Sequence, residues 1–552
     1  MLAAGHRTLC LCHRKSHTLP GSIVIGDLTS VIGIQAPSEK VPTLRVRRSI
    51  LNFGSSAFFL IVTMIVALKA SPSLVRWLGD KRFGGARVVA DGLGYLTLLE
   101  LGLGGAVGPL LARAASNGDA NTIRATIAAG VRAYVKVSLA TIALGVLLTP
   151  LLPIFARDLV GDELSDLRCA WVVGLLAFLS LGLLPLRALI EARQRGYVVN
   201  LALTGQSLAI TGLSLVLARA GWGMTGQAAA QVAGVWVCSL VLAGIALGGE
   251  GGLTLASLFQ KPPEGAGTGR AIRDLSVPTL ILNIGARVGL LADNLMVGGI
   301  LGTSRVTSLA ITQRLIVAGQ GALQSIGSAS WAALAELHVQ GHQETFNRRL
   351  IEMTRITALL AAAGLAPVVV FNRAFVRLWM GDAFVYGGDF VTLAAALNAF
   401  LLAEQSLWAW CFSATGKTKV LVIPAVASAV INLAASLILT SHVGLSGPLL
   451  GTTIGFTAVG LWALPLLLRR EFGTPIGPLA KAAGLPALFG IAATAIFWPL
   501  GTSLTFQGWA ALIGVEALGL IMILVIGVAL LLPADERAGW TKRLRSARGK
   551  AS

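Results

Sequence analysis

The chain has 552 residues, of which 55% are hydrophobic and only 12% are charged. Soluble proteins carry roughly twice this fraction of charged residues, so the composition excludes a water-soluble protein. The net charge of +19 is spread between hydrophobic runs instead of forming one patch, which argues against nucleic-acid binding. Apolar runs of about 20 residues, the length of a helix that crosses a bilayer, predict a polytopic membrane protein.

Hydropathy windows of about 19 residues predict fourteen membrane-spanning helices. The predicted spans are 50–68, 88–112, 133–156, 170–190, 199–218, 226–248, 275–300, 306–333, 354–372, 388–412, 420–440, 446–468, 480–500 and 509–532. Lys and Arg are more than twice as frequent in one set of alternate loops as in the other, and basic loops stay in the cytoplasm. Both termini are therefore predicted to be cytoplasmic, which agrees with an even number of spans.

An internal repeat supports this topology. A shift of 223 residues, the separation of Gly79 and Gly302, also superposes several other residues of one type without a gap. The further pairs are Leu78 with Leu301, Arg82 with Arg305, Gly118 with Gly341, Thr122 with Thr345, and Gly221 with Gly444. Spans one to six and seven to twelve are thus predicted to be two six-helix repeats, related by a pseudo-two-fold axis along the membrane normal around a V-shaped central cavity.

The repeat divides the chain into six predicted parts. These are a disordered cytoplasmic tail (1–48), an N-lobe with six spans (49–248), a cytoplasmic connector (249–273), a C-lobe with six spans (274–468), two further helices (469–533) and a basic cytoplasmic tail (534–552). Two lobes around a cavity are typical of an alternating-access transporter.

Charged residues inside spans cost roughly 2.5–3.5 kcal/mol each on insertion scales and usually face a bundle interior or a wet cavity. Arg287 lies near the middle of the seventh span, and Asn283 and Asn294 share its helix face. Gln313, Gln320 and Gln324 form a second polar stripe in the eighth span, and Glu100 lies near the middle of the second. These seven residues predict a substrate cavity with a fixed cation for an anionic ligand. The alternative is that they hydrogen-bond between helices or that Arg287 pairs with Glu100 or Asp293.

Two charged residues of opposite sign occupy corresponding positions in the repeats. The shift places Asp91 on Arg314, a few residues below the outer surface. We therefore predict a gate ion pair that forms when the cavity opens inward and breaks when it opens outward. The alternative is two unrelated residues at the membrane interface. The six glycines and one proline from Gly92 to Pro109 predict a bend in the second span.

Intramembrane carboxylates are also candidates for coupling transport to an ion gradient. Glu100, Asp91 and Glu404 are predicted as possible H⁺ or Na⁺ coupling residues. No metal site or cofactor is predicted, because His338 and His342 lack a His-Glu-x-x-His motif and lie in a polar loop. The sequence also contains no Walker A motif, so a built-in ATP motor is not expected.

Three segments carry a resemblance to a known family. They are Leu78-Gly-Asp-Lys-Arg-Phe-Gly84, the stretch from Gly94 to Gly108, and Ala115-Ser-Asn-Gly-Asp119. Together they resemble the N-terminal part of the O-antigen and exopolysaccharide flippases of the multidrug/oligosaccharidyl-lipid/polysaccharide (MOP) superfamily, best over residues 50 to about 200. Members usually show an acid in the Leu-x-Leu-Gly stretch, and Glu100 occupies that place.

The resemblance implies a transporter, not an enzyme, in the bacterial cytoplasmic (inner) membrane. Its substrate would be an undecaprenyl-pyrophosphate-linked oligosaccharide repeat unit, moved to the outer leaflet for O-antigen or exopolysaccharide biosynthesis. Implied partners are membrane lipids, H⁺ or Na⁺, and other polysaccharide-assembly proteins, without nucleic acid.

Several other functions remain open from the residues. A multidrug or cation antiporter of the same superfamily would need acidic cavity residues. A flippase for peptidoglycan lipid precursors would share the physics of the predicted cavity. A membrane glycosyltransferase or polymerase would need catalytic acids in sizeable outer loops, whereas the predicted outer loops are short. A proton-pumping respiratory subunit would need lysines deep inside the membrane, and the predicted spans have none there, because Lys136 and Lys481 lie near span ends.

Overall fold

The computed structural model describes residues 41–248, 254, 280, 292–381, 385–534 and 536–538. Contacts divide the chain into Met1–Leu51 and Asn52–Ser552, and every tertiary contact reported below lies within the second unit. The described residues form helices joined by short turns and contain no strand, which confirms the all-α prediction. Most of the predicted tail 1–48, most of the connector 249–273, the seventh-span residues Asn283 and Arg287, and the chain beyond residue 538 lie outside the described residues.

The region predicted as the N-lobe is built from seven α-helices, one short helix and two 3₁₀ segments. They are α2 (Val41–Thr97), α3 (Leu101–Ser116), α4 (Ala120–Leu148), η1 (Thr149–Leu151), α5 (Leu152–Phe155), α6 (Asp162–Leu175), η2 (Leu176–Leu183), α7 (Leu184–Ala192), α8 (Gly196–Arg219) and α9 (Gly223–Leu247). Neighbouring helices such as α3 and α4, or α8 and α9, pack against each other through short turns.

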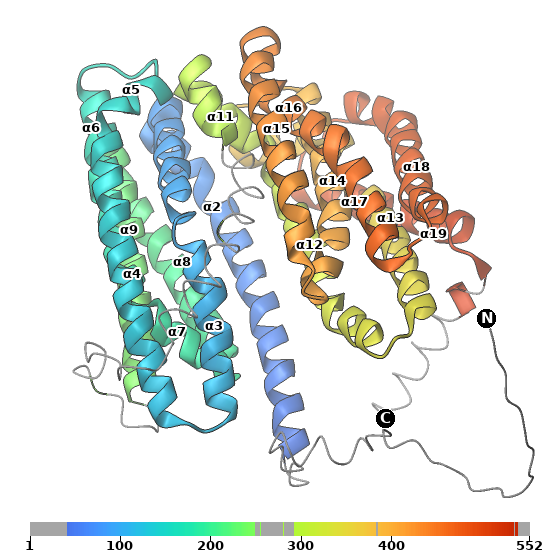
Figure 1. The fold of residues 1–552 in the computed structure, drawn as a ribbon. Coiled ribbons are helices and arrows are strands. Elements are labelled where there is room, and N and C mark those ends of the chain that lie inside the picture. The colour runs from blue at the N-terminus through green and yellow to red at the C-terminus, as the bar shows by residue number, and fades with distance from the viewer. Residues whose placement is uncertain are drawn as a thin grey trace, which may run out of the picture. The chain divides into compact units, whose positions relative to one another are not determined.

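The region predicted as the C-lobe and the two further helices follow residues 292–300, which are helical. The elements are α11 (Thr303–Thr312), α12 (Arg314–Val339), α13 (Gln343–Met380), α14 (Asp389–Ala414), η5 (Thr418–Leu421), α15 (Val422–Val443), η6 (Gly444–Ser446), α16 (Gly447–Gly455), the π-helical turn η7 (Phe456–Gly460), α17 (Leu461–Phe472), α18 (Ile476–Ser503) and α19 (Trp509–Leu531). Figure 1 shows α4, α6, α8 and α9 as one group of helices and α12 to α19 as another. Helices α18 and α19 both pack against α13.

The first two predicted spans are longer than hydropathy indicated. Residues 69–78, predicted as part of an outer loop, continue α2, and the helical path is interrupted at Gly79, whose φ is 77° and ψ 162°. Glycine adopts such a conformation without a Cβ clash, so α2 comprises two legs joined at this residue. Hydropathy does not identify residues 69–78 as helical because their polar side chains lower the mean hydropathy to a value typical of loops.

Ten described helical segments are long and apolar enough to cross a membrane. Two of them, Gly54–Thr97 and Thr418–Phe472, each cover parts of two predicted spans. The eighth predicted span is helical as α11 and α12, but it is too polar to count among the ten segments. Most of the seventh predicted span lies outside the described residues. Ten segments and fourteen predicted spans are therefore compatible.

Backbone geometry repeats at the same shift as the sequence. Three pairs of superposed glycines adopt positive φ in both copies: Gly79 and Gly302, Gly118 and Gly341, and Gly221 and Gly444. Helix ends also correspond, since α3 ends at Ser116 and α12 at Val339, and α4 and α13 begin at the matching residues of the next turn. Only glycine tolerates these turns well, which explains why glycines carry the visible repeat.

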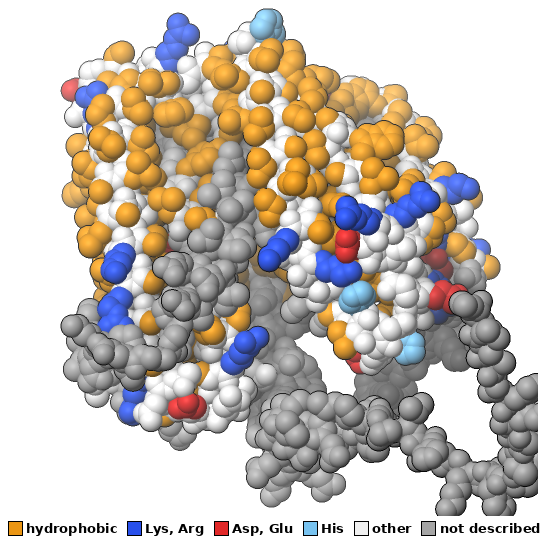
Figure 2. Space-filling view, viewed as in Figure 1, with side chains coloured by type: hydrophobic (Ala, Val, Ile, Leu, Met, Phe, Trp, Pro, Cys, Tyr) orange, Lys and Arg blue, Asp and Glu red, His pale blue; other side chains and the backbone are white. Residues whose placement is uncertain are grey.

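The surface fits a membrane environment. Figure 2 shows hydrophobic side chains covering the helices of one face, with Lys and Arg gathered mainly nearer the lower ends. Exposed large hydrophobic residues are numerous along the helices, for example Leu147, Ile423 and Leu530. A belt of apolar side chains bounded by basic residues is the pattern expected of a protein that spans a bilayer.

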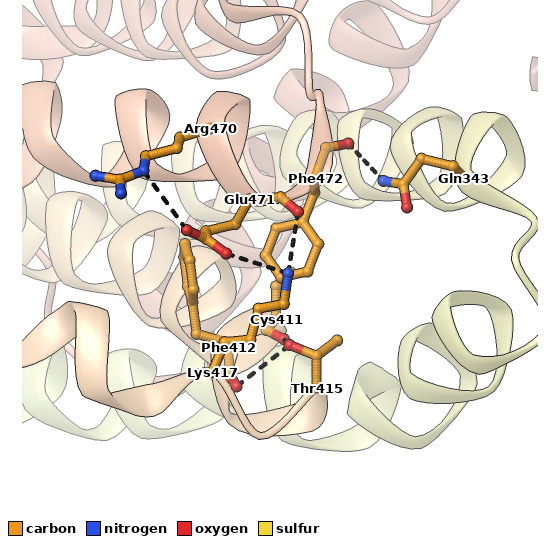
Figure 3. Close-up of polar contacts among 8 residues, drawn as sticks. All are labelled: Gln343, Cys411, Phe412, Thr415, Lys417, Arg470, Glu471 and Phe472. Carbon is orange, nitrogen blue, oxygen red and sulfur yellow. Dashed lines mark hydrogen bonds and ion pairs between the residues drawn. The ribbon is translucent and has the colours of Figure 1, made fainter.

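The end of the C-lobe that carries Gly341 is tied together by aromatic and charged side chains. Lys417 Nζ lies 4.9 Å from the centre of the Phe472 ring and 3.1 Å from Glu471 Oε2 (Figure 3). His338, considered above for metal binding, instead packs its ring against Phe346 and Phe472 at centroid distances of 6.0 and 5.3 Å. These contacts join α12, α13, α17 and the turn that follows α14 (Asp389–Ala414) at one end of the lobe.

Candidate functional site

The helical segment that follows Gly79 is interrupted between α2 and α3. Leu98–Glu100 form a turn between α2 and α3, which confirms the predicted bend. The carboxylate Oε1 of Glu100 accepts a hydrogen bond of 3.1 Å from the Tyr134 hydroxyl of α4. Glycines on both sides of the turn weaken helix propensity, which explains the break at this place. Glu100 is therefore held against a neighbouring helix of its own lobe.

A cavity of about 640 Å³ lies inside the N-lobe, among α2, η2, α7, α8 and α9. Its polar lining consists of two arginines, three glutamines and four hydroxyl residues: Arg87, Arg187, Gln206, Gln227, Gln231, Thr97, Ser180, Ser214 and Ser239. None of the described residues that line it is acidic. The cavity therefore suits a ligand that is anionic or neutral and rich in hydrogen-bonding groups, and it disfavours a cation.

The two arginines of this cavity have different surroundings. Arg187 Nε lies 3.0 Å from Glu191 Oε1, one turn further along α7, and both side chains are partly exposed. Such a pair is weak, so the Arg187 guanidinium can exchange Glu191 for another anion at small cost. The Arg87 guanidinium lies over the Phe83 ring, 5.3 Å from its centre, and the carboxylate whose charge acts on it is Asp91.

Asp91 contacts the other lobe through an asparagine. Asn294 Nδ2 donates a hydrogen bond of 2.6 Å to Asp91 Oδ2. The charge of Asp91 also acts on Asp293, whose buried Oδ1 has no hydrogen-bond partner among the described residues. Asn294, predicted to line the substrate cavity, therefore lies where α2 meets the seventh span.

The structure brings Arg314 toward Arg87 and not into an ion pair with Asp91. Arg314 is the first residue of α12, after a break in the helix at Gln313. The neighbouring charge that acts on it is that of Arg87, and no ion pair between Arg314 and Asp91 occurs among the described residues. The positive charge of Arg87, from the N-lobe, therefore acts on a guanidinium group of the C-lobe. The gate ion pair of Asp91 and Arg314 stays a prediction.

The predicted glutamine stripe follows the eighth span. Gln313 lies between α11 and α12, and Gln320 and Gln324 follow on α12. All three side chains are half-buried, and none lines the N-lobe cavity. The described residues thus bring Asp91 to Asn294 and Arg314 to Arg87, but they do not join Glu100 or the glutamine stripe to these contacts.

Glu404 lies in the interior of the C-lobe, away from the cavity. Its side chain on α14 is 1% exposed, and neither carboxylate oxygen has a hydrogen-bond partner among the described residues. The neighbouring polar residues of α14 are satisfied, since Gln405 Nε2 donates to the Phe456 carbonyl and Asn398 Nδ2 to the Leu449 carbonyl. Burying a carboxyl group without a hydrogen-bond partner is costly, so Glu404 is conspicuous among the polar residues of α14.

The two lobes are in contact at the end of the molecule that carries Gly79 and Gly302, which is the predicted outer end. Asp158 Oδ1 accepts a hydrogen bond of 2.7 Å from the backbone N–H of Thr303, at the start of α11. A Cβ on Gly84 would lie 1.8 Å from the Thr303 carbonyl oxygen, so the backbones touch there. Trp379 Nε1 donates to the Leu68 carbonyl oxygen at 2.5 Å. These contacts close the predicted outer end in this conformation.

The sequence prediction missed most of the cavity. The predicted spans leave Arg87 in an outer loop. Arg187 lies near the end of the fourth predicted span, where a basic residue indicates only the orientation in the membrane. Gln206, Gln227 and Gln231 fall inside predicted spans but were not singled out. The internal repeat offers a signal that could have identified them: the shift of 223 residues places these three amides on the apolar residues Ala429, Leu450 and Ile454.

Solved structures with a similar fold are transporters. A lipid II flippase, MurJ, in its inward closed conformation matches with a TM-score of 0.65 and 13% identity, over 87% of this chain and 97% of that one. An inward-facing multidrug resistance MATE family transporter of the MOP superfamily matches with a TM-score of 0.56 and 17% identity, over 77% of this chain and 99% of that one. An outward-facing transporter of the same kind gives a TM-score of 0.55 and 14% identity, over 84% and 99%.

These likenesses establish the fold of the chain. No protein-family model and no curated protein sequence matches it. The neighbours are a lipid II flippase and multidrug resistance MATE family transporters of the MOP superfamily, and they show the fold that this chain shares with them. At 13–17% identity they carry no residue of the site across to this chain.

Proposed function

We propose that this chain is a flippase for undecaprenyl-pyrophosphate-linked oligosaccharide repeat units. It acts in O-antigen or exopolysaccharide biosynthesis and carries the lipid-linked glycan from the cytoplasmic to the outer leaflet of the bacterial inner membrane. Both termini lie in the cytoplasm, as the distribution of Lys and Arg indicates. The resemblance of Leu78–Gly84 and Gly94–Gly108 to polysaccharide flippases supports this substrate class, and the fold supports transport by alternating access.

The observation that carries the proposal is the pair of arginines from opposite lobes. Arg87 belongs to α2 and Arg314 to α12, and the positive charge of Arg87 acts on Arg314. Like charges repel, so the arrangement is stabilised when a dianion lies between them. Pyrophosphate is such a group, and the guanidinium fork binds its oxygens in pairs. Arg287, in the predicted seventh span, adds a third guanidinium to this proposal.

The geometry suggests the order of events. With the predicted outer end closed by the Asp158–Thr303 and Gly84–Thr303 contacts, the pyrophosphate enters between the lobes from the inner side. Binding neutralises Arg87 and Arg314 and removes a repulsion that holds the lobes apart. The polyprenyl chain stays in lipid outside the lobes, because transferring it to a polar cavity would forfeit its burial in hydrocarbon.

Energy coupling is assigned to the intramembrane carboxyls. Glu404 is the strongest of the three candidates because both of its oxygens lack a partner in an apolar interior. Asp91 contacts the opposite lobe through Asn294, so its charge state can affect lobe closure. Glu100 is bound to Tyr134 and would act within the N-lobe. H⁺ or Na⁺ is the coupling ion, and the supply of substrate is the alternative driving force.

Two related functions compete with this proposal. A peptidoglycan lipid-precursor flippase has in its favour the TM-score of 0.65 to lipid II flippase MurJ, and its substrate has the same pyrophosphate. A cation antiporter is disfavoured, because the described residues that line the N-lobe cavity include two arginines and no acid. A glycosyltransferase or polymerase is disfavoured by the transporter fold.

The test measures lipid-linked oligosaccharide by leaflet in cells that lack the protein. Intact repeat units should accumulate on the cytoplasmic face, and restoring the gene should clear them. Arg87→Ala, Arg314→Ala and Arg287→Ala should each reduce clearance roughly tenfold to a hundredfold, the value of a charge-assisted hydrogen-bonded pair. Arg168→Ala, an exposed arginine on α6 outside the site, is the matched control and should clear them normally.

The outcomes separate the candidates. Normal surface polysaccharide and normal lipid-linked intermediates without the protein would refute the glycan substrate. Accumulation of lipid II instead of repeat units would establish the peptidoglycan alternative. Clearance by all three arginine variants at the normal rate would exclude the proposed pyrophosphate site.

A further inference from the structure

Of the three amide side chains in the N-lobe cavity, two lack hydrogen-bond partners and the third is only partly satisfied among the described residues. Gln206 lies near the middle of α8, and Gln231 lies on α9. Neither makes a side-chain hydrogen bond among the described residues, while Gln227 Nε2 donates to the Ser214 carbonyl oxygen at 3.1 Å and keeps its amide oxygen free. Unsatisfied amides cost free energy at this depth, so these groups face water or a ligand in the cavity.

The polar lining is not required to build a six-helix lobe. The repeat shift places Gln206 on Ala429, Gln227 on Leu450 and Gln231 on Ile454. The hydroxyl residues Ser180, Ser214 and Ser239 fall on Ala403, Leu437 and Trp462. Because the C-lobe forms the same fold with apolar residues at all six places, the N-lobe amides and hydroxyls serve something other than packing.

Helix spacing also differs between the lobes. In the C-lobe, Gly447, Gly451 and Gly455 let α16 approach α15 so closely that an added Cβ would lie within 2.1–2.8 Å of atoms of α15. The corresponding residues of α9 are Met224, Ala228 and Val232, and the first two line the cavity or its wall. Met224 and Ala228 therefore border a cavity at the places where α16 packs directly on α15, while Gly234 elsewhere on α9 approaches Ile210 of α8 closely.

The chemistry of the lining specifies the ligand. Amide and hydroxyl groups each donate and accept hydrogen bonds, which matches the hydroxyls of a sugar. The rings of Phe83 and Phe178 supply apolar surface for a sugar face. The volume of about 640 Å³ falls in the range of about 300–1,000 Å³ typical of small-molecule sites. Arg87 lines the same cavity and belongs to the proposed pyrophosphate site, so an occupant of the cavity would be contiguous with that site.

We infer that the N-lobe cavity is a glycan subsite, in which Gln206, Gln227 and Gln231 bind the sugar residues nearest the pyrophosphate and select the repeat unit that is transported. This inference rests on the proposed function, since it takes the same lipid-linked ligand. It divides recognition between two places. The arginines bind the pyrophosphate that all such substrates share, and the amides read the glycan that distinguishes them.

The experiment compares two ligands on the purified full-length protein. The first is the lipid-linked repeat unit extracted from the host, and the second is undecaprenyl pyrophosphate without sugar. Gln206→Leu and Gln231→Leu should weaken binding of the first about five- to tenfold each, the change expected for one or two neutral hydrogen bonds, and leave the second unchanged. Arg314→Ala should weaken both ligands.

Two further variants keep the test sharp. Gln206→Asn retains the amide and should recover part of the glycan affinity. Gln206→Ala removes the amide without filling the cavity as leucine does, and it should not recover the glycan affinity. Gln340→Leu removes an exposed amide bonded to Glu336 at the end of α12 and is the matched control, with no expected effect on either ligand. Detergent melting temperatures identify variants that fail to fold, for which Gln206→Ala and Gln231→Ala then replace the leucine variants.

Each outcome has one meaning. Selective loss of the glycosylated ligand supports the glycan subsite. Equal weakening of both ligands, or of neither, overturns it while the pyrophosphate binding of the normal protein still supports the proposed function. Failure of the normal protein to bind either ligand overturns the proposed function itself.

Discussion

The two lobes share a backbone plan but differ in what their interiors contain. In the N-lobe the second leg breaks at Leu98–Glu100, and a cavity with two arginines and three glutamines lies among the helices. In the C-lobe the corresponding leg breaks instead at Gln313, and the central helices α13 and α14 are largely buried. Asn398 and Gln405 of this core are hydrogen-bonded to neighbouring helices, whereas the side chains of Glu404 and Thr357 have no hydrogen-bond partner among the described residues.

The fold and the proposed function depend on different residues. Glycines at turns, such as Gly118 and Gly341, keep the same conformation in both copies because the chain must reverse there. Residues that face the interior differ between the two copies. Gln206 of the N-lobe corresponds to Ala429 of the C-lobe, and Leu181 of the N-lobe corresponds to Glu404 of the C-lobe. One lobe is thereby suited to a polar ligand and the other to a buried proton.

The largest expected effect comes from giving the N-lobe the acid of the C-lobe. Leu181 lines the cavity and corresponds to Glu404, so Leu181→Glu introduces a carboxylate beside the cavity arginines. The like charge should repel an anionic substrate and lower transport on the order of a hundredfold, or about 3 kcal/mol. Leaflet-resolved transport of repeat units measures it. Leu181→Gln is the neutral control, and equal inhibition by both variants would contradict the charge argument.

The next effect tests the close packing that distinguishes the C-lobe. Gly451→Ala places a Cβ 2.4 Å from the backbone nitrogen of Ser436, so α16 must move away from α15. Overpacking of this kind should destabilise the protein by about 1–3 kcal/mol. Thermal unfolding in detergent measures the change. The reciprocal control is Ala228→Gly on α9, which should cost less, and an equal cost for both substitutions would remove the packing difference between the lobes.

A smaller effect is expected when the unpartnered acid of the C-lobe is removed. Glu404→Leu replaces it with the residue found at the corresponding N-lobe position and should raise stability by about 1 kcal/mol, because a buried polar group without partners is lost. Transport driven by an ion gradient should fall at the same time. Unfolding and gradient-driven transport are measured in parallel with Glu404→Gln. Transport that keeps its full ion dependence in Glu404→Leu would exclude Glu404 as a coupling residue.

The smallest effect concerns matching helix starts. Asp119 caps α4 by accepting hydrogen bonds of 3.0 Å from the N–H groups of Asn121 and Thr122, whereas His342 at the start of α13 makes no such bond. Hydrogen bonding from Thr122 lowers the pKa of the Asp119 carboxyl below its ordinary value of 3.8. A lowered folded-state pKa means that the stabilisation is present above pH 3.8 and is lost as the pH falls through the lowered pKa.

Amide hydrogen exchange tests this difference between the helix starts. Exchange at Asn121 and Thr122 should show protection that decreases on acidification below pH 3.8, and Asp119→Ala should abolish the decrease. The start of α13 serves as the internal reference. The same acid response there, without a side-chain cap, would show that the effect does not come from Asp119.

Some residues of the candidate site could be predicted from the sequence and others could not. Arg314, Asn294, Asp91 and Glu404 were identified because a polar residue inside a hydrophobic run is conspicuous. Their partners were not identified, since the contact between Asp91 and Asn294 joins residues 203 positions apart. The cavity glutamines were visible as letters but not as a group, because α2, α8 and α9 come together only in the folded lobe.

The sequence by itself determined the membrane location, the all-helical class, the repeat and the bend in the second span. These follow from composition, hydropathy and glycine positions, which act locally along the chain. The tertiary structure alone decided that α2 continues through residues 69–78, that Arg314 approaches Arg87, and that a polar cavity lies in one lobe and not at the equivalent place in the packed core around α15 and α16. The reason is physical: a helix face acquires its neighbours from side-chain volume and charge across the whole lobe, and no local pattern specifies which faces meet.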